Sequence, residues 1–226
     1  MSRGIFVTGT DTGIGKTFAA VAIMQALRHR GLSVAGMKPV ASGCEPGIDG
    51  DLINDDALQL QSVASHMYPY EQVNPYAFLE PIAPHIAAQK CNKEVSLDKI
   101  CVAYETLSSS SQWVIVEGAG GWRVPINQNQ TTSDLVRSLH LDVIMVVGLR
   151  LGCINHALLT AEAIRNDGIR LSGWVINCLS DDYLDEEETV KTLTGKINSP
   201  CLGRIPWQSA CPQDFINCES LLEDRV

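Results

Sequence analysis

Apolar residues in this chain gather into short continuous runs, and longer stretches with helical spacing separate them. A short apolar run is typical of a strand that is buried on both faces of a parallel sheet. Such runs lie at residues 5–7, 33–37, 113–116, 143–147, 174–176 and 202–205. Between the first two runs, residues 16–30 are apolar nearly all round, which favours a helix packed against that sheet, and Gly31 is expected to end it.

Further helices are predicted between the later runs. After a glycine-rich loop, Asp56 opens a stretch in which apolar residues recur at helical spacing, at Leu60, Val63, Ala64 and Met67. The same spacing recurs at 97–104, and residues 156–167 form another helical stretch with glycine behind it. The acidic run 181–188 is interpreted as a solvated loop leading into a helix. Strands that alternate with helices predict a doubly wound, mostly parallel α/β sheet with helices on both faces.

A glycine-rich turn joins the first strand to the first helix, and it reads Gly-Thr-Asp-Thr-Gly-Ile-Gly-Lys-Thr at residues 9–17. In this context a helix N-terminus and successive backbone N–H groups bind phosphate, Lys16 reaches the terminal phosphates, and the Thr17 hydroxyl ligates Mg²⁺. The usual P-loop pattern has its first glycine five residues before the second, where this chain has Thr10; its glycine is at position 9 instead. The Gly-Lys-Thr end is intact, so the sequence predicts a P-loop NTPase type of sheet, in a single domain over residues 1–226.

The length and net charge of the chain limit the classes of partner that it can bind. A net charge of −9 on 226 residues argues against nucleic acid, whose binding needs a basic face. No run approaches the 18 apolar residues of a membrane span, and no signal peptide precedes the first strand, so we expect a cytosolic protein. The eight cysteines form no C-x-x-C pair, and the five histidines lack metal-ligand spacing, so neither disulfides nor zinc are expected.

Polar residues at the ends of the predicted strands are the candidates for chemistry, because ligands bind there in this fold. Lys38 is either solvated or a second cation facing the phosphates, and beside a phosphate loop the second interpretation is favoured. Glu117, before a run of glycines, suits Mg²⁺. Asp56 either holds metal or favours the helix dipole. Asn177 either pairs with a purine edge or forms a turn, and residues 205–207 form a hydrophobic wall or a turn.

The ordered set of motifs resembles the ATP-dependent dethiobiotin synthetase family. The motifs are residues 9–17, Lys-Pro-Val-Ala-Ser-Gly at 38–43, Asn-Pro-Tyr at 74–76, Pro-His at 84–85, Glu-Gly-Ala-Gly-Gly-Trp at 117–122, Leu-Gly-Cys-Ile-Asn-His at 151–156, Gly-Trp-Val at 173–175 and Ile-Pro-Trp at 205–207. They occur in the family's order and cover the chain beyond its sixth strand. The shifted phosphate loop is itself the family's form.

The resemblance implies a reaction and a set of site residues. ATP, CO₂ and diaminopelargonic acid would give dethiobiotin through a carbamate and a mixed carbamic-phosphoric anhydride. The catalytic residues would be Lys16, Lys38, Thr12 and Ser42, and the Mg²⁺ ligands Thr17, Asp56 and Glu117. The nucleotide would contact Gly13, Ile14, Gly15, Lys16, Thr17, Phe18, Asp56, Glu117, Gly118, Ala119, Gly120, Asn177, Cys178, Pro206, Trp207, Gln208 and Gln213. The diamine would contact Ser42, Leu151, Gly152, Cys153 and Asn155, at the interface of a homodimer.

Two departures and two alternatives accompany this interpretation. Arg150 stands where relatives have lysine, and Thr189 stands where they have tyrosine, so recognition of the substrate carboxylate is the least secure inference. One alternative is a cobyrinic-acid-type synthetase, for whose glutaminase domain the chain has no room. The other is a partition- or septum-type ATPase switch, which places an extra lysine near the start of its loop, where this chain has Thr10 and Asp11.

Overall fold

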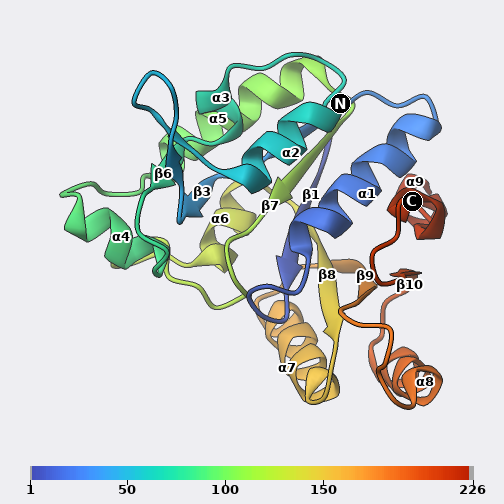
Figure 1. Cartoon of the computed structure of the whole chain (residues 1–226). Helices are drawn as coiled ribbons and strands as arrows, with labels where there is room; N and C mark the ends of the chain where they lie inside the picture. The colour runs from blue at the N-terminus through green and yellow to red at the C-terminus, as the bar shows by residue number, and fades with distance from the viewer. Residues whose placement is uncertain (1, 224–226) are drawn as a thin grey trace.

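The structure is a computed structural model that describes residues 2–223. Its centre is a six-stranded parallel sheet in the order β10-β9-β8-β1-β7-β2. Figure 1 labels the strands of this sheet from β10 to β7. The strands are β1 (Arg3–Gly9), β2 (Val34–Met37), β7 (Trp113–Glu117), β8 (Asp142–Leu149), β9 (Leu171–Cys178) and β10 (Cys201–Ile205). β2 lies within its predicted apolar run, and each of the other five strands contains its own. The predicted parallel α/β sheet is therefore confirmed.

Helices cover both faces of this sheet. They are α1 (Lys16–His29), α2 (Asp55–Val63), α3 (Tyr70–Val73), α4 (Pro84–Lys90), α5 (Leu97–Ser110), α6 (Thr132–Ser138), α7 (Cys153–Asn166), α8 (Glu186–Lys196) and α9 (Glu219–Leu222), with a 3₁₀ turn η1 at Pro212–Phe215. On one face α1 packs on inward residues of β1, β7 and β8. On the other, α5 and α6 pack around β7, and α7 packs on β8 and β9. Because a hydrophobic core lies on each face of the sheet, both faces of the central strands are buried, and their sequences are continuous apolar runs.

Two pairs of short strands form separate two-stranded sheets in the segment after β2. β3 (Val40–Ser42) pairs in parallel with β6 (Tyr76–Phe78), and β4 (Glu45–Pro46) pairs antiparallel with β5 (Leu52–Ile53). The buried side chain of Asn74 donates to the main-chain oxygens of Lys38 at 2.6 Å and Tyr76 at 3.2 Å. Asn74 therefore fixes the point where the chain leaves β2 and turns into β3, directly beside Lys38.

Two predicted helix boundaries are wrong by about a turn. The second predicted helix extends to Met67, whereas α2 ends at Val63 and Met67 is almost fully exposed. The predicted helix over 156–167 begins one turn earlier, at Cys153, because Gly152 adopts a positive φ of 92° in front of it. Within residues 2–223, no helix has the length and apolar character needed to cross a membrane.

Candidate active site

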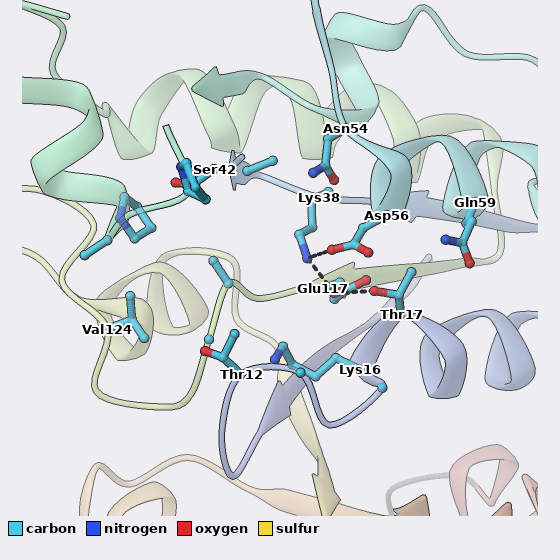
Figure 2. A pocket seen from close by; sticks show the side chains of 18 of the residues that line it. Thr12, Lys16, Thr17, Lys38, Ser42, Asn54, Asp56, Gln59, Glu117 and Val124 are labelled. Carbon is cyan, nitrogen blue, oxygen red and sulfur yellow. Dashed lines mark hydrogen bonds and ion pairs between the residues drawn. The ribbon is translucent and has the colours of Figure 1, made fainter. Parts of the chain in front are cut away.

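A cavity of about 770 Å³ opens where β1, β2 and β7 end, at the edge predicted from the fold. Figure 2 shows the phosphate loop on one side of this cavity and the segment around Ser42 on the other. The lining contains twelve of the sequence-predicted residues: Thr12, Gly13, Gly15, Lys16, Thr17, Phe18, Lys38, Ser42, Asp56, Glu117, Ala119 and Gly120. These residues come from four separate segments of the chain, which therefore meet in one cavity.

The phosphate loop lies between β1 and α1 with open backbone donors. Gly13 and Gly15 have φ values of 71° and 79°, which glycine adopts without strain. Gly15 precedes α1 and offers no side-chain cap, so the first N–H groups of the helix are free for an anion. A Cβ on Gly9 would lie 2.9 Å from side-chain atoms of Ile14 and Lys16. The loop therefore needs its glycine at position 9, which accounts for the shifted pattern.

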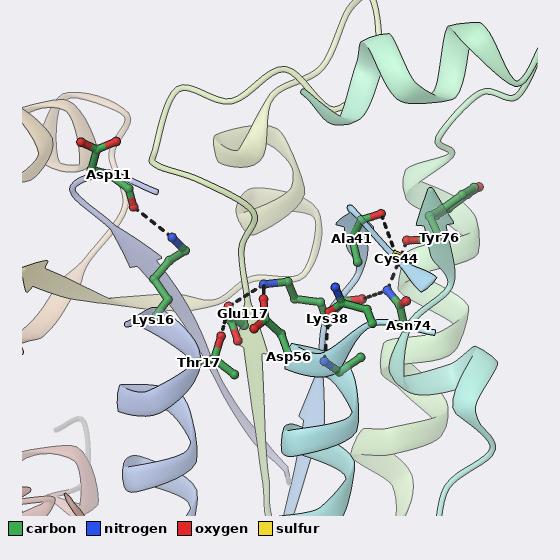
Figure 3. A network of polar contacts seen from close by, with 12 residues as sticks. Asp11, Lys16, Thr17, Lys38, Ala41, Cys44, Asp56, Asn74, Tyr76 and Glu117 are labelled. Carbon is green, nitrogen blue, oxygen red and sulfur yellow. Dashed lines mark hydrogen bonds and ion pairs between the residues drawn. The ribbon is translucent and has the colours of Figure 1, made fainter. Parts of the chain in front are cut away.

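Lys16 lies within this loop and is only 7% exposed. Its Nζ donates to the main-chain oxygen of Asp11 at 3.0 Å (Figure 3). Burial, together with the positive charge of Lys38, lowers the pKa of Lys16 to about 8. Within residues 2–223 the Lys16 ammonium group donates only to a carbonyl oxygen, an arrangement that a phosphate would improve.

Lys38 lies at the centre of a buried network of charged side chains (Figure 3). Its Nζ lies 2.5 Å from Oε1 of Glu117 and 2.8 Å from Oδ2 of Asp56, and Thr17 Oγ1 donates to the same Glu117 oxygen at 3.0 Å. Burial alone would disfavour the charged amine, but the two carboxylates outweigh it and raise the pKa of Lys38. Burial likewise opposes ionisation of Asp56, and Lys38 overcomes it and lowers the Asp56 pKa.

This network shows where the Asp56 carboxylate points, and both interpretations of Asp56 stay predictions. The N-cap of α2 is Asn54, whose Oδ1 accepts from the backbone N–H of Ala57 at 3.1 Å. The Asp56 carboxylate is therefore not needed as a cap, and it points to Lys38 instead. Asn54 also lines the cavity, although the sequence analysis did not single it out. An asparagine directly before two aspartates is an N-cap signal that could have identified it.

Two buried oxygens in the cavity lack a hydrogen-bond partner among residues 2–223. They are Oε2 of Glu117, on a side chain that is 1% exposed, and Oγ of Ser42. Buried polar atoms are nearly always paired, so an unpaired one needs a reason such as a missing ligand. Both atoms belong to residues that line the cavity, one on each side of Lys38.

Asn177 lies at the end of β9 beneath the phosphate loop, outside the cavity lining. Its Nδ2 donates to the main-chain oxygen of Ile14 at 2.9 Å, while its buried Oδ1 has no partner among the described residues. A Cβ on Gly15 would lie 2.2 Å from the same Nδ2. The side chain of Asn177 therefore supports the loop through Nδ2, a contact that the sequence analysis did not consider, and its purine-edge role stays a prediction.

A protein-family model and known proteins match most of the chain. A family model described as an AAA domain matches residues 3–213. The ATP-dependent dethiobiotin synthetase BioD of Cellvibrio japonicus is 48% identical over 94% of this chain and 92% of its own length. The enzyme of the same name from Pseudomonas aeruginosa is 52% identical over 89% of this chain and 88% of its own.

The chain belongs to the ATP-dependent dethiobiotin synthetase family.

Solved structures show the same fold at much lower identity. A ParA family ATPase from Chlorobium tepidum matches 98% of this synthetase chain and 90% of its own length, with a TM-score of 0.54 and 15% identity. The MinD cell division protein of Aquifex aeolicus matches 92% of this chain and 83% of its own, with a TM-score of 0.52 and 15% identity. At such identity the likeness establishes the P-loop type of sheet and carries no argument for a partition-type function.

The remaining predicted residues of this dethiobiotin synthetase lie outside the cavity. Cys178, at the end of β9, donates from Sγ to Glu186 Oε1 at 3.4 Å, and burial and this carboxylate raise its pKa to about 12. Residues 206–208 follow β10, with Trp207 45% exposed, and Gln213 lies in η1. β9 and β10 lie on the other side of β1 from β2, so these segments lie away from Lys38; Asn177 contacts the phosphate loop, and η1 packs against α1.

The segment expected to bind the substrate carboxylate lies at the start of α7. Leu151 is 94% exposed and Asn155 is exposed, whereas the Cys153 side chain is buried in the core between α7 and β9. Cys153 can therefore contact a ligand only through its backbone. Arg150, just before this segment, forms an ion pair with Asp11 of the phosphate loop.

Proposed function

We propose that this chain catalyses the ATP-dependent conversion of diaminopelargonic acid and CO₂ to dethiobiotin. The observation that carries the proposal is the meeting of the two lysines. Lys16 begins α1 and Lys38 follows β2, yet both line one cavity beside an open phosphate loop. Phosphoryl transfer asks a protein mainly for positioning and charge neutralisation, which two buried ammonium groups supply without a covalent nucleophile.

The catalytic roles follow from the positions of the side chains. One amine of the substrate captures CO₂ as a carbamate, which attacks the γ-phosphate, and the second amine closes the ring on the mixed anhydride. Lys16 and Lys38 stabilise the negative charges of carbamate and phosphoryl group. Thr12 and the unpaired Ser42 hydroxyl, which line the cavity on opposite sides, hydrogen-bond the carbamate. Holding the second amine near the anhydride can supply about 7–11 kcal/mol of the barrier.

A magnesium ion fits the donor set around Glu117. Hydroxyl and carboxylate oxygens are the ligands that Mg²⁺ prefers, and the Oε2 atom of Glu117 is buried without a partner among residues 2–223. We infer that Thr17, Asp56 and Glu117 hold the ion. When bound, Mg²⁺ would neutralise charge on the β- and γ-phosphates. In this structure Lys38 neutralises the carboxylates of Asp56 and Glu117.

The nucleotide would extend from the phosphate loop toward the ends of β9 and β10. The phosphates bind the backbone of residues 13–18 and of 118–120. Adenine then reaches Asn177, Cys178 and residues 206–208, with Gln213 a further contact. The buried Oδ1 of Asn177 has no partner among the described residues, and the exposed Trp207 ring offers an apolar surface. Both features support an amine-bearing ring at this place.

The carboxylate of the diamine would bind the start of α7, at Leu151, Gly152, Cys153 and Asn155, in a homodimer. No side chain caps α7, so its first N–H groups are available to a carboxylate. Leu151 at 94% and Leu159 at 57% exposure give this end of the helix an apolar surface that a second copy would cover.

The direct test is product formation. The purified chain is incubated with ATP, Mg²⁺, bicarbonate and diaminopelargonic acid, and dethiobiotin and phosphate are measured together. We expect equal amounts of both, with phosphate release dependent on the diamine. ATP hydrolysis that the diamine leaves unchanged, without dethiobiotin, would instead support a nucleotide switch of the partition type.

A further inference from the structure

The glycine-rich loop after β7 forms one wall of the cavity, and its middle has no main-chain support. Its ends are fixed, because Gly118 N donates to Val7 O at 3.0 Å and Val124 O accepts from Thr132 N at 2.9 Å. Between them, residues 119–123 make no backbone hydrogen bond to any part of residues 2–223. A small void of about 20 Å³ also lies against Gly118, Ala119 and Val124, so this part of the loop is not fully packed. Side chains must therefore hold this wall in place.

Two side chains of the loop provide that support, and both bind one carboxylate. The indole Nε1 of Trp122 donates to Asp167 Oδ2 at 2.7 Å, and Arg123 lies 2.8 Å from the same oxygen. A third donor comes from α6, where Arg137 lies 3.2 Å from Asp167 Oδ1. Asp167 directly follows α7, and its side chain is only 12% exposed. Trp122 is 3% exposed and packs edge-on against Phe6, with ring centroids 6.5 Å apart.

The supported wall touches the catalytic side of the cavity. A Cβ on Gly120 would lie 3.1 Å from Val124 and 3.6 Å from the hydroxyl of Thr12, so the loop closely follows the phosphate loop. Ala119, Gly120 and Val124 all line the cavity, and Figure 2 shows Val124 and Thr12 on the same side of it. A shift of the Trp122 anchor would therefore move the wall against which the proposed carbamate lies.

We propose that Asp167 is a positioning residue, which fixes the catalytic wall at residues 119–124 through Trp122 and Arg123. This inference rests on the proposed function, since it assigns a role in that reaction to a side chain that does not touch the cavity. It also gives a purpose to Trp122, which has no part in the catalytic roles although its motif at 117–122 supplies Glu117. Misplacing a reacting group by about 1 Å can cost up to 100-fold in rate, so a remote anchor can matter for turnover.

The test compares Asp167→Ala with Asp134→Ala. Asp134 is a matched control, because it also binds Arg137, at 3.0 Å, and caps α6 by accepting from Thr131 N at 2.8 Å, but it does not contact the loop. We expect both variants to lose thermal stability. Only Asp167→Ala should raise the KM for the diamine, about tenfold. The KM for ATP should change less than about twofold, because the backbone of residues 13–18 holds the phosphates.

Two further variants separate positioning from general damage. Trp122→Phe removes the Nε1 donor together with part of the ring system, and it should reproduce the KM change without adding to it in the double variant with Asp167→Ala. Asp167→Asn keeps an oxygen that accepts from Trp122, and it should restore part of the loss.

The proposal fails if Asp167→Ala leaves the KM for the diamine unchanged, or if KM rises in both aspartate variants in proportion to their loss of stability. Failure of the proposed function has a different signature, because the unmodified chain would then form no dethiobiotin.

Discussion

Replacing Lys38 by methionine tests the central charge network. Methionine keeps most of the apolar stem and removes the ammonium group, leaving Glu117, at 1% exposure, and Asp56 without their cation. Breaking a buried ion pair costs about 3–5 kcal/mol. The Asp56 side chain is 39% exposed and regains water, so we expect the free energy of unfolding to fall by about 3 kcal/mol. For a chain of this length that corresponds to a melting temperature about 6–12 °C lower.

The same variant should respond more strongly to magnesium. In the unmodified chain Lys38 occupies the space between the two carboxylates that are proposed to ligate Mg²⁺, so metal and lysine compete. Without the lysine, Mg²⁺ is the remaining cation for these carboxylates. A ligand at 100 times its dissociation constant stabilises a protein by about 2.7 kcal/mol. Thermal unfolding without nucleotide, measured over a series of Mg²⁺ concentrations, should therefore show recovery at lower Mg²⁺ in Lys38→Met than in the unmodified chain.

Lys90→Met is the matched control for this measurement. Lys90 forms an ion pair of the same length, 2.5 Å, with Glu80, but both side chains are about half exposed. Its loss should cost no more than about 1 kcal/mol and should not change the response to Mg²⁺. The reasoning is refuted if Lys38→Met melts no lower than Lys90→Met, or if Mg²⁺ stabilises Lys38→Met no more than the unmodified chain.

Three more outcomes are expected. Because the pKa of Lys16 is lowered to about 8, half of the free enzyme carries a neutral amine at pH 8, and bound phosphates favour the charged form. ATP binding should thus take up about 0.5 proton at pH 8 and almost none at pH 6.5, measured by calorimetry in buffers of different ionisation enthalpy; equal uptake at both pH values would contradict the lowered pKa. Gly15→Ala should weaken nucleotide binding far more than Gly13→Ala, since both have positive φ but only Gly15 meets Asn177; similar losses in a nucleotide titration would argue against the Asn177 support. Glu117→Gln should raise the Mg²⁺ concentration needed for half-maximal activity, and an unchanged titration would remove Glu117 from the metal site.

Local patterns were sufficient to predict the sheet and the phosphate loop. The apolar run of β1, the glycines and the helix α1 are contiguous, so the sequence contains the whole strand-turn-helix unit. Lys38 and Glu117 could also be placed, because each directly follows or ends a buried strand and parallel strands end at one edge. Boundaries failed where one residue decided them, as at Gly152, whose positive φ starts α7 a turn early.

The pairing of the charges could not be predicted from local patterns, because it depends on distances that only the fold sets. Lys38 is 18 residues from Asp56 and 79 from Glu117, and no spacing rule connects them. From the sequence Asp56 fits a helix cap as well as a ligand, and only the geometry of Asn54 frees it for Lys38. The same holds for Asp167, which lies 45 residues from Trp122 and looks like an ordinary helix end. Sequence therefore identifies groups that face a ligand from strand ends, whereas the charges that hold those groups in place become visible only after folding.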